Sequence, residues 1–350
     1  MHNIYDLSFN QIQELIRSKG FPPYRSDQIW IGLYKHFFRS ADQFTTLPLK
    51  LRQELACDFT FDPIERVNSI ETPDQKTSKV LFSLDNNFTF ETVLMKYDNR
   101  RTLCISCQVG CGIGCVFCAT GQMGYKRNLS CGEIVAQVLY FAHQLNVVNE
   151  KISNIVFMGM GEPFHNYDST MEAIDRFNHP KGFNFGARRI TVSTVGIIPG
   201  IRKFTLEKRQ VNLAVSLHST DDKIRTSIIP INRKFPVDHL LDACKEYVEQ
   251  TRRRITFEWA LINGLNDSLD HAKELINRLK IFRSDNGSFL CQVNIIPLNL
   301  TEGYSGQPPK KSDLIAFREV LMSARIPCTI RMRRGIDIQA GCGQLASKTS

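Results

Sequence analysis

The 350-residue sequence has no apolar run long enough to span a membrane, which excludes a membrane-embedded chain of ordinary helices. Its first residues, Met1–Asp6, lack the basic and apolar segments of a secretory signal, so we expect a cytoplasmic protein with no membrane partner. There is no low-complexity tract and no repeat beyond strand–helix units. Hydrophobic residues make up 42% of the chain and charged residues 23%, which is typical of a globular protein.

Disulfide bonds are not expected as a scaffold, although the chain has eleven cysteines. Without a secretory signal, so many cysteines favour thiolate chemistry in a reducing compartment. Their distribution agrees, because six of them fall within one short stretch. These six are Cys104, Cys107, Cys111, Cys115, Cys118 and Cys131.

The densest cysteine motif lacks a fourth member. Cys111, Cys115 and Cys118 follow the spacing Cys-x3-Cys-x2-Cys, with the aromatic Phe117 before the last cysteine. A structural zinc ion takes four ligands, and a fully protein-ligated iron–sulfur cube takes four thiolates. Three thiolates would leave one iron open to a substrate, and this spacing is similar to that of the radical S-adenosylmethionine (SAM) superfamily. The alternatives are a zinc knuckle or three unrelated core thiols.

The segment 102–300 alternates short apolar strands with helices, which predicts an α/β fold with a parallel sheet and right-handed crossovers. The predicted strands are Leu103–Ser106, Ile155–Met158, Arg189–Ser193, Asn212–Ser216, Ile255–Ala260 and Gln292–Ile296. Six such units indicate an open, partial (β/α)6 barrel. In barrels of this kind the chemistry lies at the carboxyl ends of the strands.

Three other regions flank this partial barrel. Residues 1–75 are predicted to form a small N-terminal helical accessory domain, with a helix over Arg25–Tyr34 capped by Ser26 or Asp27. Residues 76–101 alternate as a β-hairpin linker region. Residues 301–350 form a C-terminal extension with a helix at Ser312–Ala324 and a strand at Cys328–Arg331.

Candidate cofactor-binding residues follow the predicted strands. Gly161 and Glu162 come after the second strand, where glycine allows close approach and a carboxylate can bind an ammonium group such as that of SAM. Hydroxyl, amide and imidazole groups at the later strand ends suit the ribose, carboxylate and adenine of a nucleoside cofactor. These groups belong to Ser193, Ser216, His218 and Asn299, and Leu217, between Ser216 and His218 at the same strand end, is included as a candidate. Each could equally be an ordinary turn or a structural residue.

Cys342 lies between two glycines near the chain end, where packing gives no reason for a cysteine, so we favour a reactive thiol over a bland free cysteine. The net charge of +9 and a pI of about 9 make a polyanionic partner plausible. Basic residues cluster at Arg252–Arg254, Lys310–Lys311 and Arg331–Arg334, and each cluster taken singly could be a solvated face.

Three motifs together resemble the RlmN/Cfr family of radical SAM RNA methyltransferases: Cys104–Cys111 (CISCQVGC), Gly159–Pro163 (GMGEP) and Gly341–Leu345 (GCGQL). The resemblance extends over essentially the whole chain. It implies methylation of an adenine in the peptidyl-transferase centre of 23S rRNA. The RlmN branch acts on carbon 2 and, in some bacteria, also on an adenine of the tRNA anticodon loop. The Cfr branch acts on carbon 8 and confers antibiotic resistance; Pro163 and residues 252–267 favour the RlmN branch.

The resemblance also implies cofactors and roles. A 4Fe-4S cluster would be held by Cys111, Cys115 and Cys118, with two SAM molecules used per turnover, a flavodoxin-type electron donor and a monomeric enzyme. Carbon 2 of adenine is electron-poor and cannot attack the SAM methyl group, so a radical route is needed. Cys342 would accept a methyl group, a 5′-deoxyadenosyl radical would remove hydrogen from it, and the methylene radical would add to an adenine splayed out of its RNA stack.

A protein–RNA crosslink then has to be resolved. That role maps to Cys104 through a transient disulfide with Cys342, and Glu91 matches the family's proton acceptor, its alternative being an exposed strand carboxylate. Two other functions remain open at this point: methylation of carbon 8, and a non-catalytic zinc-dependent RNA-binding protein.

Overall fold

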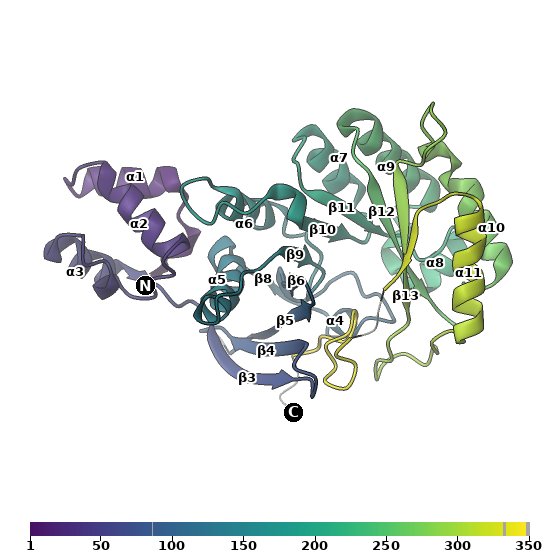
Figure 1. Ribbon diagram of the computed structural model, residues 1–350, viewed down its shortest axis with the longest axis horizontal. Helices are drawn as coiled ribbons and strands as arrows, with labels where there is room; N and C mark the ends of the chain where they lie inside the picture. The colour runs from purple at the N-terminus through teal and green to yellow at the C-terminus, as the bar shows by residue number, and fades with distance from the viewer. Residues whose placement is uncertain (86, 332–333, 348–350) are drawn as a thin grey trace.

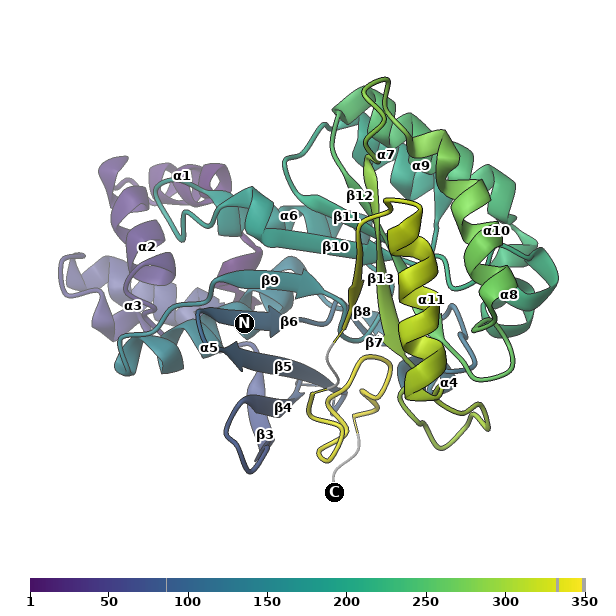
Figure 2. The same cartoon turned by 45° about the vertical axis from the view of Figure 1, so that its right-hand side comes forward.

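The computed structural model describes residues 1–85, 87–331 and 334–347, and its centre is a curved sheet of ten strands (Figures 1 and 2). From one edge to the other, the strand order is β14-β13-β12-β11-β10-β9-β6-β5-β4-β3. Their bounds are β3 Glu65–Glu71, β4 Thr77–Ser83, β5 Thr89–Tyr97, β6 Arg100–Cys104, β9 Asn154–Phe157, β10 Ile190–Thr194, β11 Asn212–Ser216, β12 Ile255–Leu261, β13 Cys291–Pro297 and β14 Cys328–Ile330. Two short pairs stand apart: β1 His2–Asn3 with β2 Phe59–Thr60, and β7 Gln108–Gly110 with β8 Tyr125–Asn128.

The parallel part of the sheet confirms the predicted partial barrel. All six predicted strands form, in the expected order, and each pairs with its neighbour in parallel. The strand predicted in the C-terminal extension, β14, also joins the sheet in parallel with β13. The sheet does not close, because β14 and β3 stand at its two edges.

The β4–β5 hairpin continues the sheet beyond β6 through antiparallel pairing, so it is part of the scaffold and not a connection between two units. The strand β3, at residues 65–71, extends this edge and corrects the prediction that residues 1–75 are helical. Its sequence, ERVNSIE, is largely exposed and has no apolar face. An edge strand with so little burial leaves no alternating pattern from which it could be predicted.

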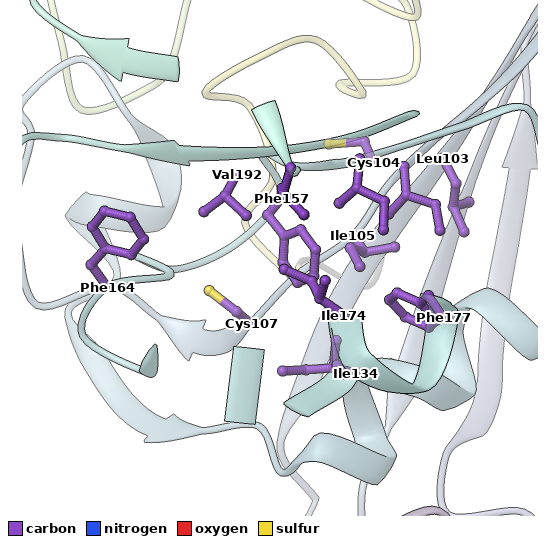
Figure 3. Packing of buried hydrophobic residues seen from close by; sticks show 14 of the residues in the cluster. Leu103, Cys104, Ile105, Cys107, Ile134, Phe157, Phe164, Ile174, Phe177 and Val192 are labelled. Atoms are coloured by element: carbon purple, nitrogen blue, oxygen red, sulfur yellow. The ribbon is translucent and has the colours of Figure 1, made fainter. Parts of the chain in front are cut away.

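Helices cover the outer face of the parallel strands (Figure 2). Their bounds are α5 Cys131–Val147, α6 Tyr167–Asn178, α7 Ile198–Leu206, α8 Asp222–Ile228, α9 Val237–Thr251, α10 Leu269–Leu279 and α11 Lys311–Ser323. Figure 3 shows how the core is built where Phe157 of β9 and Val192 of β10 face Ile134 of α5 and Ile174 of α6. All four are essentially inaccessible to solvent, as expected for parallel strands that are covered by helices.

The first helices, α1 Phe9–Ser18, α2 Tyr24–Tyr34 and α3 Leu49–Asp58, form a module beside α5 and α6 (Figure 1). The helix α2 begins at Tyr24, directly after Pro23, so the predicted caps Ser26 and Asp27 lie inside it. Trp30 of α2 packs against the His179 ring at a centroid distance of 4.8 Å, which joins the module to the end of α6. Across the described residues, none of the helices has the length and apolar character needed to cross a membrane.

Candidate active site

A cavity of about 150 Å³ opens at the carboxyl ends of the parallel strands. Its walls come from the loop after β7, the ends of β9 to β13 and the chain end. Residues that the sequence analysis singled out form much of the lining. They are Cys111, Cys115, Cys118, Gly161, Glu162, Ser193, Ser216, His218, Asn299 and Cys342. The fold therefore gathers into one place residues that are separated by more than two hundred positions.

The three clustered cysteines lie on a loop between β7 and the short helix α4, Ala119–Gln122. Backbone hydrogen bonds fix this loop at both ends: the Cys111 amide donates to the Gly124 carbonyl at 3.1 Å, and the Val116 amide to the Ile228 carbonyl at 3.1 Å. Gly110 is required here, because a Cβ at this position would lie 1.9 Å from the Gly124 oxygen. The loop thus presents its thiols to the cavity from a fixed backbone.

Three thiols that line one cavity match the number of protein ligands of an iron–sulfur cube with one open iron. Within the described part of the chain, no three Cys, His or acidic side chains are arranged as ligands of one metal ion. In a cube each thiolate binds a different iron, so its ligands stand further apart. Burial raises the pKa of Cys111 to about 12 and that of Cys115 well above its ordinary value. Thiols of this kind ionise when a metal centre supplies the compensating positive charge.

Glu162 lies at the cavity wall with 4% of its surface exposed. Its two carboxylate oxygens accept the backbone amides of Phe164, at 3.0 Å, and Val195, at 2.8 Å, so it also braces the loops after β9 and β10. Burial raises the pKa of Glu162 to about 7 against the lowering effect of these hydrogen bonds. An ammonium group in the cavity would stabilise the charged form.

Gly161 is required for packing. Its φ is +104°, and a Cβ here would lie 2.6 Å from the Cβ of Gln108. The glycine therefore allows the loop after β9 to pack closely against β7. The sequence had suggested only that it allows a ligand to approach the backbone.

The remaining predicted cofactor-binding residues divide into two groups. Ser193, Ser216 and Asn299 line the cavity, as does His218, whose Nδ1 accepts the Ala260 amide at 2.8 Å. Burial lowers the pKa of His218 to about 3, so the imidazole is neutral at physiological pH. Leu217 differs from these four: it is fully buried, and it lies in the core behind the cavity.

A second, smaller cavity of about 40 Å³ is lined by both Cys104 and Cys342. Cys104 ends β6 and Cys342 lies in the chain end, so the fold confirms that the tail reaches the barrel mouth. Both are free thiols in this structure. Burial raises the pKa of Cys104 to about 12. Cys342 is accessible, but its surface faces the cavities, and the surrounding protein raises the pKa of its thiol as well.

The sequence analysis missed two charged residues at this site. Arg331 lines both cavities, and its guanidinium lowers the pKa of Cys104 and of Cys342, partly opposing the effect of burial. Glu258, 3% exposed on β12, lines the larger cavity and accepts a hydrogen bond from Asn294 at 2.8 Å. One acid inside the apolar strand Ile255–Ala260 could have indicated an inward-facing carboxylate. Arg331 could have been suspected because it directly follows the last strand.

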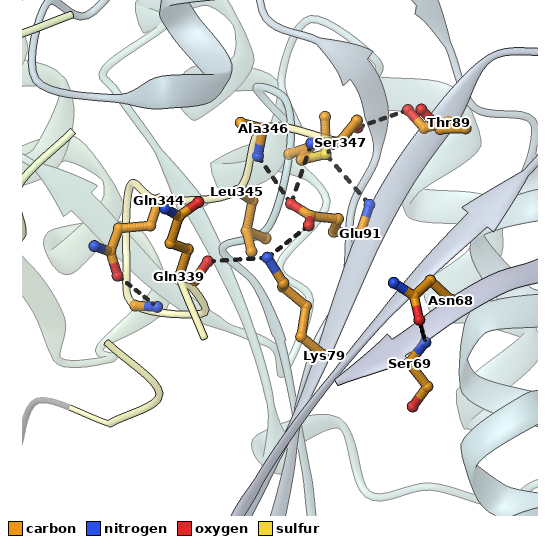
Figure 4. A network of polar contacts seen from close by, with 12 residues as sticks. Asn68, Ser69, Lys79, Thr89, Glu91, Gln339, Gln344, Leu345, Ala346 and Ser347 are labelled. Carbon is orange, nitrogen blue, oxygen red and sulfur yellow. Dashed lines mark hydrogen bonds and ion pairs between the residues drawn. The ribbon is translucent and has the colours of Figure 1, made fainter. Parts of the chain in front are cut away.

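Glu91 occupies a different setting from the other predicted catalytic residues. It lies on β5 with 1% of its surface exposed, so the alternative of an exposed strand carboxylate is wrong. Figure 4 shows its carboxylate between Lys79 and the chain end. Neither of the two cavities that contain Cys342 has Glu91 among its lining residues.

The basic clusters are spread over the molecule. Arg252–Arg254 precede β12 and therefore lie at the opposite end of the sheet from the cavity. Lys310 caps α11. In the third cluster, Met332 and Arg333 lie outside the described residues, whereas Arg334 stacks over the Tyr97 ring at 4.3 Å and lines the smaller cavity beside Arg331. Only this third cluster, of the three, reaches the cavities.

A partial parallel barrel with three clustered thiols at its mouth defines a class of protein. The sequence model of the radical SAM superfamily matches residues 105–278, which include the cysteine motif and most of the parallel strands. The chain belongs to this superfamily, and its full-length relatives place it within the RlmN family.

One relative is the dual-specificity RNA methyltransferase RlmN 1 of Myxococcus xanthus, 44% identical over 98% of this chain and 94% of its own length. Another is the probable dual-specificity RNA methyltransferase RlmN of Chloroflexus aurantiacus, 43% identical over 99% of this chain and 93% of its own. The crystal structure of a radical SAM methyltransferase from Sphaerobacter thermophilus superposes with a TM-score of 0.95 at 44% identity. It covers 99% of this chain and 100% of that structure's chain.

Proposed function

We propose that this protein is a radical SAM RNA methyltransferase that methylates carbon 2 of an adenine in 23S rRNA, with a tRNA anticodon-loop adenine as a second substrate. One observation carries the proposal: Cys104 and Cys342 line the same small cavity, and Cys342 also lines the larger cavity with the three clustered thiols. A methyltransferase that used SAM directly would need neither of these two thiols. The names of the relatives support RNA as the substrate class.

Cys111, Cys115 and Cys118 would hold a 4Fe-4S cluster, which supplies the electron for reductive cleavage of SAM. The carboxylate of Glu162, which is buried in the cavity wall beside the cysteine loop, would bind the ammonium group of SAM. Ser193, Ser216 and Asn299 offer hydroxyl and amide groups to the rest of the cofactor. Neutral His218 can offer its second ring nitrogen in the same cavity without adding charge.

Cys342 would carry the methyl group. A thiolate is strongly nucleophilic, so Cys342 can take a methyl group from one SAM, with S-adenosylhomocysteine leaving. Burial raises the pKa of Cys342, and the Arg331 guanidinium partly offsets this effect, so Arg331 would help to stabilise that thiolate. The methyl carbon, after losing hydrogen to the 5′-deoxyadenosyl radical derived from a second SAM, bonds to carbon 2 of adenine.

Cys104 would then resolve the crosslink. It faces the smaller cavity together with Cys342. The adduct radical would lose one electron to the oxidised cluster, and Cys104 would take the proton from carbon 2 of adenine. Attack of the Cys104 sulfur on the Cys342 sulfur would break the bond from sulfur to the methylene carbon, which takes up that proton and becomes the methyl group; the disulfide left behind would be reduced to two thiols by the flavodoxin-type donor. The confined, mostly apolar setting protects radical intermediates from water. Carbon-8 methylation uses the same arrangement of thiols and is the second candidate.

Anaerobic incubation of the cluster-loaded enzyme with SAM, a reductant and either a 23S rRNA fragment or tRNA tests the proposal. Chromatography with mass spectrometry against nucleoside standards should detect 2-methyladenosine. Cys342→Ala should abolish the product while leaving the iron–sulfur absorption unchanged. Formation of 8-methyladenosine, retained activity in Cys342→Ala, or zinc in place of iron would contradict it.

A further inference from the structure

The buried carboxylate of Glu91 ties the end of the chain to the β4–β5 hairpin, and the Ser347 hydroxyl adds a hydrogen bond to the Thr89 carbonyl at 2.8 Å (Figure 4). The Oε2 atom of Glu91 accepts the backbone amides of Ala346, at 2.8 Å, and Ser347, at 3.2 Å. Its other oxygen, Oε1, lies 2.8 Å from the ammonium nitrogen of Lys79. Lys79 also donates to the Gln339 carbonyl at 3.4 Å, so the ion pair contacts the chain on both sides of Cys342.

Two further elements hold the same stretch, residues 341–347, which we call the tail segment. From α4, the Ala119 amide donates to the Gly343 carbonyl and the Thr120 hydroxyl to the Leu345 carbonyl, both at 2.7 Å. From the loop after β13, the Asn299 side chain donates to the Cys342 carbonyl at 3.0 Å. Cys342 therefore lies on a segment that is hydrogen-bonded to α4, to the loop after β13 and to the hairpin.

Because the Glu91 carboxylate is buried, its hydrogen bonds with the tail segment contribute strongly to holding that segment in place. A carboxylate removed from water needs charged or hydrogen-bonding partners for both oxygens, and here the tail segment supplies two of them. Charge-assisted hydrogen bonds of this type are stronger than neutral ones. Release of the tail segment would remove two hydrogen-bond donors from the Oε2 atom of Glu91, so the hairpin favours the seated tail.

The same geometry argues against direct proton transfer by Glu91. Both carboxylate oxygens are engaged, and the residue lies outside the lining of the two cavities that contain Cys342. A general base must come within hydrogen-bond reach of the proton it removes.

We propose that Glu91, paired with Lys79, is a positioning residue that anchors the tail segment and so places Cys342 at the cavity. This inference deepens the proposed function and rests on it, because Cys342 has to be presented both to SAM and to the RNA. The two possible roles of Glu91 affect different steps. An anchor is needed before the protein–RNA bond forms, whereas a proton acceptor is needed after it has formed.

The test compares Glu91→Gln, Glu91→Ala and Lys79→Met with the wild-type enzyme. Glu71→Gln is the matched control, because Glu71 pairs with Lys96 at 3.6 Å on the same sheet without contacting the tail segment. Amide hydrogen exchange, read by mass spectrometry on the full chain, needs no catalysis. Peptides from β12 report whether each variant is folded.

We expect Glu91→Ala and Lys79→Met to speed exchange across residues 339–347 by roughly tenfold or more, with β12 unchanged. Glu91→Gln should show a smaller increase, because its amide oxygen still accepts the two backbone amides. Glu71→Gln should match the wild type. Unchanged exchange in the tail segment of Glu91→Ala would overturn the anchor, whether or not the enzyme methylates RNA.

The covalent protein–RNA adduct supplies the second readout. With RNA, SAM and a reductant, cluster-loaded Cys104→Ala should accumulate the adduct under anaerobic conditions, since the resolving thiol is missing. Adding Glu91→Gln to Cys104→Ala should lower the amount of adduct, because a loosened tail segment presents Cys342 less often. If Glu91→Gln alone accumulates the adduct while its tail segment stays protected, Glu91 is a proton acceptor and the proposal is wrong.

Discussion

Glu162 braces the fold and, in the proposed function, would also bind the ammonium group of SAM. Its oxygens accept two backbone amides at the ends of β9 and β10, and its burial raises its pKa to about 7. An ammonium group binds the carboxylate and not the neutral acid. The free site must therefore lose a proton before or during SAM binding at acidic pH.

The affinity for SAM should consequently depend on pH. Below about pH 7 the empty site holds protonated Glu162, so the affinity should fall by up to about tenfold for each pH unit, and above that value it should level off. Calorimetric titration of the cluster-loaded enzyme at several pH values measures this. Glu162→Gln should bind SAM more weakly and lose the pH dependence; a pH-dependent affinity in that variant would assign the titration to another group.

Arg331 is the residue through which Cys104 and Cys342, the two thiols proposed to act in catalysis, share one positive charge. It lines both cavities, and its guanidinium lowers the pKa of Cys104 and Cys342. Removal of this charge in Arg331→Met should raise the pKa of the Cys342 thiol, and each unit of increase would slow methyl acceptance about tenfold near neutral pH.

The measurement is the fraction of Cys342 that carries a methyl group in purified protein, read by peptide mass spectrometry. We expect a lower fraction in Arg331→Met and partial recovery in Arg331→Lys. Arg334→Met is the control, because Arg334 donates to the Lys96 carbonyl and stacks on Tyr97. An unchanged fraction in Arg331→Met would show that Cys342 ionises without this guanidinium.

At the scale of elements, the parallel strands could be predicted because each is a short apolar run between helices. The positions of Gly161, Glu162, Ser193 and Asn299 then followed from topology, since the carboxyl ends of parallel strands meet at one edge. The edge strand β3 could not be predicted, because its polar sequence has no buried face. Contacts of the tail, such as those of Glu91, depend on long-range folding that no local pattern records.

The loop after β9 gives an element-scale prediction about backbone geometry. Gly161→Ala should destabilise the protein by about 3 kcal/mol, because the new methyl group would clash with Gln108 and the φ of +104° disfavours any side chain. Gly264→Ala is the matched control: its φ is +69°, and nothing lies within 4 Å of the added Cβ. It should cost only about 1 kcal/mol.

Urea unfolding followed by circular dichroism measures both free energies of unfolding. Gly161→Ala should also weaken SAM binding, because the loop carries Glu162. Equal losses in the two variants would mean that the contact with Gln108 is not the limiting one.

For the whole molecule, the main feature is that the segments before and after the barrel in the sequence meet in space. The hairpin β4–β5 precedes the barrel and the tail segment follows it, yet Glu91 contacts residues 255 and 256 positions later in the chain. Cys104 and Cys342 share a cavity for the same reason. Cys104 and Cys342 therefore come together only when the barrel, the hairpin and the chain end are all in place.

The central claim is that the methyl group reaches RNA by way of Cys342. The most direct measurement uses protein isolated from cells grown with isotope-labelled methionine, incubated anaerobically for a single turnover with unlabelled SAM and 23S rRNA. The account predicts that the label leaves the Cys342 peptide and appears in the methyl group on carbon 2 of adenine. Unlabelled methyladenosine with the label retained on the protein would contradict it.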